Sequence, residues 1–147
     1  MSLSLFRLPQ ESAQYFYQEI REILFDEHAL QSTQILMLRN ILREILQAVT
    51  ADEPQLFTDL YSRLLFVADK YALPPYILRE LHAFRRIATR AGRKNSKLTV
   101  EAVHSSARAL ALVIFFFSEE RAPEPLRTAL LTAKPFTKEA ATTKEIV

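Results

Sequence analysis

The chain of 147 residues contains no cysteine and a single glycine, Gly92. Without cysteine it can form no disulfide and no Cys-based metal or nucleophile site. One glycine cannot build the phosphate-binding loops of P-loop or dinucleotide-binding proteins, whose backbones need several glycines. The shortage also favours long helices joined by short loops, because few positions then require a positive φ. These absences exclude several classes of enzyme and favour a helical fold.

Targeting and membrane signals are also missing from the sequence. The start, MSLSLFRLPQESAQ, has no basic segment followed by a long apolar run, so we expect no signal peptide. The longest wholly apolar run, residues 109–117, is much shorter than the roughly 20 residues that cross a bilayer. We therefore read it as a buried helix. The lack of cysteine fits a reducing compartment, and we expect a cytoplasmic protein with no membrane partner.

No group of residues has the spacing of a catalytic or metal-binding motif. The three histidines, His28, His82 and His104, stand apart from one another and from any acidic cluster. Adjacent acids such as Glu119 and Glu120 point in different directions on a helix, so they make poor acid–base pairs. The sequence therefore predicts no enzyme, no metal site and no cofactor.

Composition and periodicity predict an all-α bundle. Hydrophobic residues make up 49% and charged residues 24% of the chain, which is typical of a folded protein, and the length favours one domain. We expect that domain over 1–132, packed around the apolar segment 107–117. Residues 133–147 lack periodicity and read as a flexible tail or linker. Apolar residues three to four apart predict five main helices and a short C-terminal one: 10–28, 33–50, 53–71, 75–91, 100–121 and 124–132.

Capping residues suggest where these helices begin and end. Thr99 is a good N-cap for the fifth helix, and Ser32 or Thr33 for the second. Asp52, followed by a proline, suggests the start of the third. Gly92 is expected to adopt the left-handed conformation that often ends a helix, here the fourth.

A basic stretch is the feature of the sequence that best suggests a function. Residues 81–100 contain six Lys or Arg and no acid, whereas the whole chain has a net charge of only +2. A helix end and loop at 85–97 would hold most of these charges, with neutral donors nearby. No aromatic residue lies within 85–99, so stacking on bases is not expected there. We predict phosphate contacts by five residues of this stretch: Arg86, Arg90, Arg93, Lys94 and Lys97.

Two segments resemble known helical domains. The stretch LHAFRRIATRAGRKNSKLTVEAVHSSARALALVIFFFSE resembles the C-terminal half of HEPN-like domains, in which a basic helix end and a loop precede a long apolar helix. Leu98-Thr99-Val100-Glu101 matches the usual start of that last helix. The preceding LYSRLLFVADKYALPPYILRELHAF is similar to N-terminal regions of some bacterial superfamily I helicase-like proteins. Together the resemblance covers roughly residues 55–120.

The resemblance implies a non-catalytic member of that family. Catalytic HEPN ribonucleases use an Arg followed a few residues later by a His. Counted from Arg86, the positions that would hold this His are Ala91, Gly92 and Arg93. The group with a pKa near neutrality is therefore missing from the expected place.

We thus expect a non-enzymatic accessory or interaction module whose basic stretch contacts the phosphates of DNA, RNA or another polyanion. Two alternatives remain open. The ten Phe and five Tyr residues fit a protein-interaction or dimerisation domain with exposed apolar surface. A ribonuclease using His82 or His104 together with the arginines is the other.

Overall fold

In a computed structural model of the chain, residues 6–93 and 97–132 are described, and they form six α-helices and no strand. The predicted all-α fold, with five main helices and a short C-terminal one, is confirmed. The predicted tail, 133–147, lies outside the described residues. The helices are α1 (Gln10–Leu24), α2 (Gln31–Val49), α3 (Leu60–Tyr71), α4 (Pro75–Ala91), α5 (Val100–Ser118) and α6 (Leu126–Leu131).

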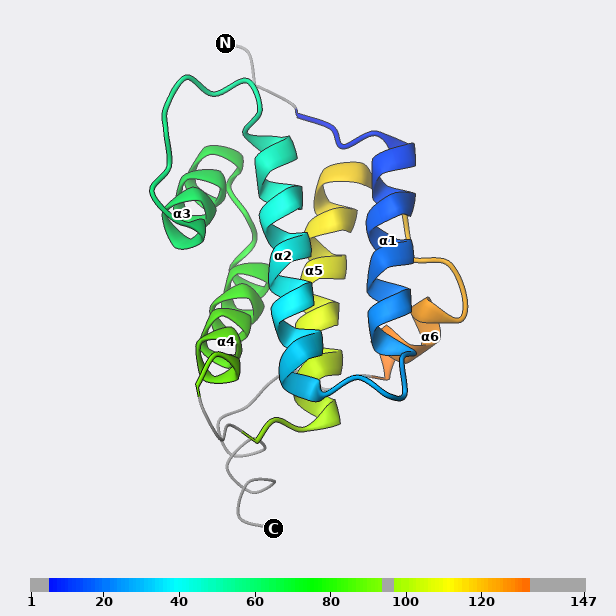
Figure 1. Cartoon of the computed structure of the whole chain (residues 1–147). Coiled ribbons are helices and arrows are strands. Elements are labelled where there is room, and N and C mark those ends of the chain that lie inside the picture. Colours follow the sequence, from blue (N-terminus) through cyan, green and yellow to red (C-terminus); the bar gives the residue numbers. More distant parts are fainter. Residues whose placement is uncertain (1–5, 94–96, 133–147) are drawn as a thin grey trace.

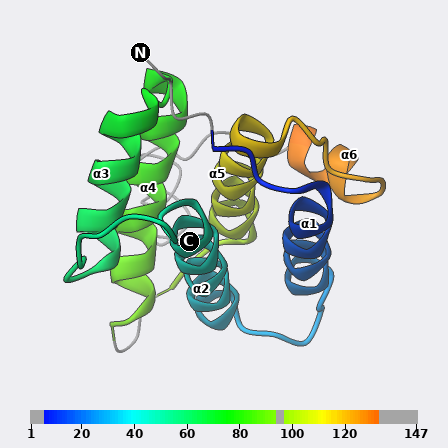
Figure 2. The ribbon, with the colours of Figure 1, turned by 90° about the horizontal axis from the view of Figure 1, so that it is seen from above.

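Four helices alternate in direction to make the body of the bundle. Figure 1 shows α1 and α4 running down the page, and α2 and α5 running up it. α5 contacts α1, α2, α4 and α6, and α2 contacts α1, α3 and α4. The pair α2–α5 therefore holds α1 and α4 on opposite sides of the molecule, as both views show (Figures 1 and 2).

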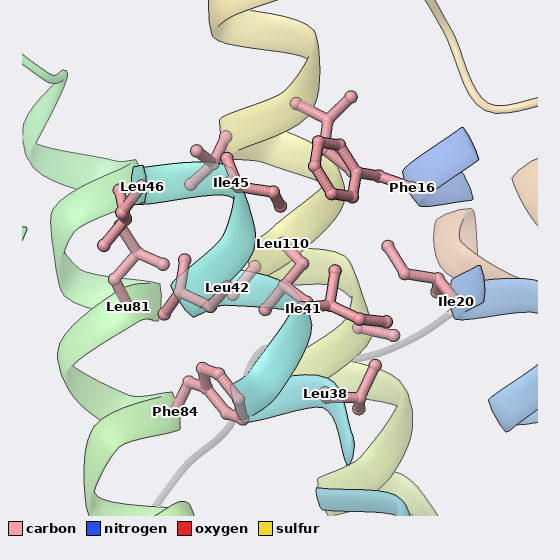
Figure 3. Packing of buried hydrophobic residues seen from close by; sticks show 14 of the residues in the cluster. Phe16, Ile20, Leu38, Ile41, Leu42, Ile45, Leu46, Leu81, Phe84 and Leu110 are labelled. Atoms are coloured by element: carbon pink, nitrogen blue, oxygen red, sulfur yellow. The ribbon is translucent and has the colours of Figure 1, made fainter. Parts of the chain in front are cut away.

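The core lies where these four helices meet. Leu38, Ile45 and Leu46 of α2 and Leu110 of α5 are fully buried, and Figure 3 shows them among side chains from α1 and α4. Removing such side chains from water is the main favourable contribution to folding, about 1.5–3 kcal/mol for each. α5 is also long and apolar enough to pass a length-and-composition test for a membrane span. The core helix of a bundle passes the same test.

Two predicted boundaries at the first connection are wrong. α1 ends at Leu24 rather than near residue 28, because the Asp26 carboxylate accepts a hydrogen bond from the His28 amide and turns the chain. α2 begins at Gln31, before the predicted caps Ser32 and Thr33. The buried Gln34 amide donates to the Ile23 carbonyl at 2.7 Å, so a tertiary contact, not a local cap, sets this start.

The third helix begins later than predicted. Asp59, not Asp52, caps α3, and its carboxylate accepts from the Ser62 amide at 2.7 Å. Residues 53–59, predicted to begin this helix, are non-helical, and Leu56 among them is 97% exposed. At its other end α3 stops at Ala72, which takes the left-handed conformation (φ 53°).

Some predictions for the ends of α4 and α5 are confirmed and others are wrong. Both bounds of the fourth helix are confirmed, but Gly92 has φ −81° and is not left-handed. The Thr99 cap is confirmed, since its hydroxyl accepts from the Ala102 amide at 3.0 Å. α5 ends at Ser118, three residues early, because Glu119 turns left-handed (φ 60°).

Candidate anion-binding surface on the fourth helix

The apolar stripe of α4 decides which of its side chains face solvent. Ile77, Leu81, Phe84 and Ile87 are buried against α2 and α5. Arg79 and Arg86 are seven residues apart, so they share another face of the helix, and Arg93 follows just beyond its end; all three are exposed. Packing of the core thus lines up basic side chains along one flank of α4.

The five predicted phosphate ligands are only partly brought together. Arg86, Arg93 and Lys97 are exposed, on the helix and in the segment that follows it. Arg90 is half-buried and already engaged in an interaction. Lys94 lies outside the described residues.

A groove of about 590 Å³ opens between α4 and α5. Of the five predicted ligands, Arg86 alone is among the residues that line it. Two arginines that sequence reasoning missed, Arg79 of α4 and Arg108 of α5, join it there. Against these three guanidinium groups stands one carboxylate, Glu80. The other polar lining residues are Tyr76, His82, Ser105 and Ser106.

Glu80 partly compensates this positive charge. Its Oε1 lies 3.5 Å from Nε of Arg108, which joins α4 to α5 across the groove. Burial raises the pKa of Glu80, and the charges of Arg108 and Arg79 oppose the rise. The guanidinium groups stay charged at any physiological pH, so the groove remains net positive.

The two serines of the groove serve their own helix. The hydroxyls of Ser105 and Ser106 both donate to the Ala102 carbonyl, at 3.2 and 2.7 Å. Both side chains are buried. Because these donors are already used, a ligand in the groove would be held chiefly by the guanidinium groups.

Aromatic side chains do lie beside the basic stretch, although the sequence between 85 and 99 contains none. Tyr76 is half exposed at one end of the groove. On the other flank of α4, the guanidinium carbon of Arg85 lies 3.8 Å from the centroid of the Tyr61 ring. The His82 ring lies 5.9 Å from the same tyrosine. Tyr61 comes from a different helix, so no local pattern could have revealed this neighbour.

Of the two histidines considered for catalysis, one shares a groove with a predicted arginine. His82 lines the α4–α5 groove with Arg86, whereas neither His104 nor Arg90 is among its lining residues. His104 is partly buried on α5, and burial lowers its pKa. Within residues 6–93 and 97–132, no three His, Asp or Glu side chains are placed to hold a metal ion.

Comparison of the chain with protein-family models, with curated proteins and with solved structures found no match. The HEPN-like resemblance therefore stays a prediction, and function is argued below from the residues of the groove.

Proposed function

We propose that this chain is a non-enzymatic helical module that binds the phosphate groups of nucleic acid through α4. The supporting observation is the groove in which Arg79, Arg86 and Arg108 face a single carboxylate. Arg93 and Lys97, both exposed beyond the end of α4, add further positive charge. Such a module would act as an accessory to a cytoplasmic nucleic-acid-processing machine.

The length of the surface favours a polymeric ligand. Arg79 and Arg86 are seven residues apart on α4, which is about 10 Å along the helix axis, and Arg93 and Lys97 lie beyond the end of the helix. A single phosphate reaches one or two guanidinium groups, whereas a nucleic-acid backbone presents charges at regular intervals. Arg also suits phosphate, because its planar fork donates two parallel hydrogen bonds. Contacts of this kind position a protein on the backbone and read no sequence.

The test is fluorescence anisotropy of labelled single-stranded and duplex DNA and RNA. The decisive variant combines Arg79→Gln with Arg86→Gln. Its matched control combines Arg21→Gln with Arg121→Gln, two exposed arginines outside the groove, so both proteins have the same net charge. We expect the groove variant to bind about tenfold or more weakly at about 50 mM salt, with a shallower salt dependence, and the control to match the wild type.

A variant that removes negative charge from the groove gives a second test. Glu80→Gln removes the one carboxylate of the groove and keeps its size. We expect tighter binding, by a few-fold at about 50 mM salt, because nearby charges are weakly screened there. Equal loss of affinity in the groove variant and its control, or no binding by the wild type at low salt, would refute the proposal.

A second candidate function, self-association, is favoured by an apolar groove of about 420 Å³ along α5 and α6. Phe115 and Leu131 are exposed there by 42% and 75%, beside Ala111, Leu112 and Leu130. Exposed apolar surface of this kind marks interaction sites, and a second copy of the chain is the partner we would test. Sedimentation equilibrium should then show a dimer that Leu131→Glu dissociates; a monomer at all concentrations would exclude it.

A further inference from the structure

A second arginine-lined groove lies on the opposite flank of α4, between α2, α3 and α4. Its volume is about 340 Å³. Arg39 and Arg43, one turn apart on α2, face Arg85 of α4 across a floor of apolar side chains. Arg85 and Arg86 are neighbours in the chain but line different grooves. The two grooves are therefore separate sites on two sides of one helix.

The three guanidinium groups of this groove outnumber its one carboxylate. Among residues 6–93 and 97–132, no carboxylate forms an ion pair with Arg39, Arg43 or Arg85. The acid in the lining is Asp59, whose Oδ1 accepts from the Ser62 amide to cap α3. This hydrogen bond lowers the pKa of Asp59, and the positive charge of Arg85 lowers it further, so Asp59 stays ionised and offsets part of the charge of the three arginines.

Neutral neighbours hold these side chains in place. The Arg85 guanidinium stacks on the ring of Tyr61 at 3.8 Å. Arg43 donates from Nη1 to the Asn40 side-chain oxygen at 2.7 Å. Both contacts orient a guanidinium group through a neutral partner, and side chains held in place before a ligand arrives make a preorganised binding site.

One donor in the groove has no acceptor at all. Nε of Arg39 is buried and has no hydrogen-bond partner in the structure. A buried donor without a partner costs stability, as does gathering like charges, and proteins keep such local conflicts mainly at functional sites. A compact anion with several acceptor oxygens would match this set of donors.

We propose that the groove between α2, α3 and α4 binds a phosphate group through Arg39, Arg43 and Arg85. The apolar floor and the limited volume suit one phosphate better than a continuous backbone. Two sources share this chemistry: a free phosphate compound, or the terminal phosphate of a nucleic-acid strand. This site does not depend on the α4–α5 groove, and it would stand if the function proposed for that groove failed.

Binding of inorganic phosphate and pyrophosphate is measured by isothermal titration calorimetry and by thermal melting, against sodium chloride at equal ionic strength. The site variant combines Arg39→Gln with Arg43→Gln, and the control again combines Arg21→Gln with Arg121→Gln. We expect saturable binding that raises the melting temperature of the wild type and of the control. In the site variant the affinity should fall about tenfold or more, the loss expected when charge-assisted hydrogen bonds are removed. Absence of saturable binding in the wild type, or equal loss in both variants, would overturn the assignment.

The melting temperature without ligand provides an independent readout. Since three arginines gather around one carboxylate and repel one another, we expect the site variant to melt at or above the wild-type temperature. A clear decrease would mean that the arginines support the fold and would count against the site. Should the double variant misfold, Arg85→Lys keeps the charge but loses the planar fork, and it should weaken phosphate binding while its circular dichroism stays native.

The source of the phosphate is decided with two single strands of equal sequence, one ending in a 5′-phosphate and one in a 5′-hydroxyl. Tighter binding of the phosphorylated strand that disappears in the site variant assigns a nucleic-acid end. Equal binding of the two strands, together with saturable binding of free phosphate, assigns a small ligand. These strands are also titrated against Arg79→Gln with Arg86→Gln, so failure of the α4–α5 groove is seen separately.

Discussion

Burial acts in the same sense on two titratable side chains near the α4–α5 interface. It raises the pKa of Glu80 on α4 and lowers the pKa of His104 on α5. The directions differ, but in both cases the neutral form is favoured, because the interior solvates charge poorly. The permanent positive charge of the nearby groove thus comes from arginines, which do not respond to such burial.

At the residue scale, His104 should make stability depend on pH. Its folded-state pKa lies below the ordinary 6.5, chiefly through burial, with Glu101 opposing. As pH falls below 6.5 the unfolded chain takes up the proton first, so stability present above that pH is lost toward the folded-state pKa. We expect His104→Gln to flatten this decline in urea-unfolding free energies measured between about pH 7 and pH 5.

His28→Gln serves as the matched control, because His28 is exposed. It should leave the pH dependence of the wild type unchanged. Curves that coincide for the wild type and His104→Gln would show that the imidazole is equally easy to protonate in the folded and unfolded chains.

At the element scale, the cap decides where a helix starts when the apolar pattern is ambiguous. The segment before α3 offers two aspartates, and Asp52, with Glu53 and Pro54 after it, looks the better cap in sequence. The structure uses Asp59, whose carboxylate reaches the Ser62 amide. An ion pair between Glu53 and Lys70 instead ties this segment to the end of α3.

Alanine substitutions distinguish the two possible starts of α3. Asp59→Ala should lower the unfolding free energy by about 1 kcal/mol, the usual value of an N-cap. Asp52→Ala should change it by less than about 0.5 kcal/mol, as exposed surface substitutions do. Urea denaturation of both variants measures this, and the reverse order would place the start of α3 at the earlier aspartate.

Elements with one dominant signal were predictable from the sequence. α4 has a regular apolar stripe and two prolines at its start, so both of its bounds followed. Thr99 followed from cap chemistry alone. The conformation of Gly92 could not be predicted in this way. Glycine permits a left-handed turn but does not require one, and Gly92 has φ −81°.

The candidate sites were less predictable, because they converge from several helices. Arg86 was found from the charge of its own segment. Arg108, Arg39 and Tyr61 come from α5, α2 and α3, and nothing local connects them to α4. Sequence patterns show which side chains share one helix face, whereas a groove depends on which faces meet.

At the scale of the whole molecule, opposite charges lie on opposite sides. α4 carries four Arg and one Glu, and α1 carries three Glu and one Arg. A groove of about 380 Å³ between α1 and α2 is lined by Glu19, Glu22, Asp26 and Glu44. The pair α2–α5 lies between α1 and α4 (Figure 2).

Removing negative charge from the acidic side should therefore change nucleic-acid affinity only when salt screens charges weakly. We expect Glu19→Gln with Glu22→Gln to change nucleic-acid affinity less than about twofold at 0.15 M salt, where the Debye length is about 8 Å. At about 0.01 M salt, where that length is about 30 Å, binding should tighten. Anisotropy titrations at both salts measure this, and a large effect at the higher salt would place ligand near α1.

Separation of α1 from α4 also has a consequence for the rate of encounter. A body that is positive on one edge and negative on the other rotates in the field of a polyanion while still approaching it, so more collisions arrive with α4 in front. This torque exists only in the folded chain, because the α2–α5 pair is what keeps the two edges apart. Orientation during diffusion is thus a product of topology, and added salt would slow association before it loosened the bound state.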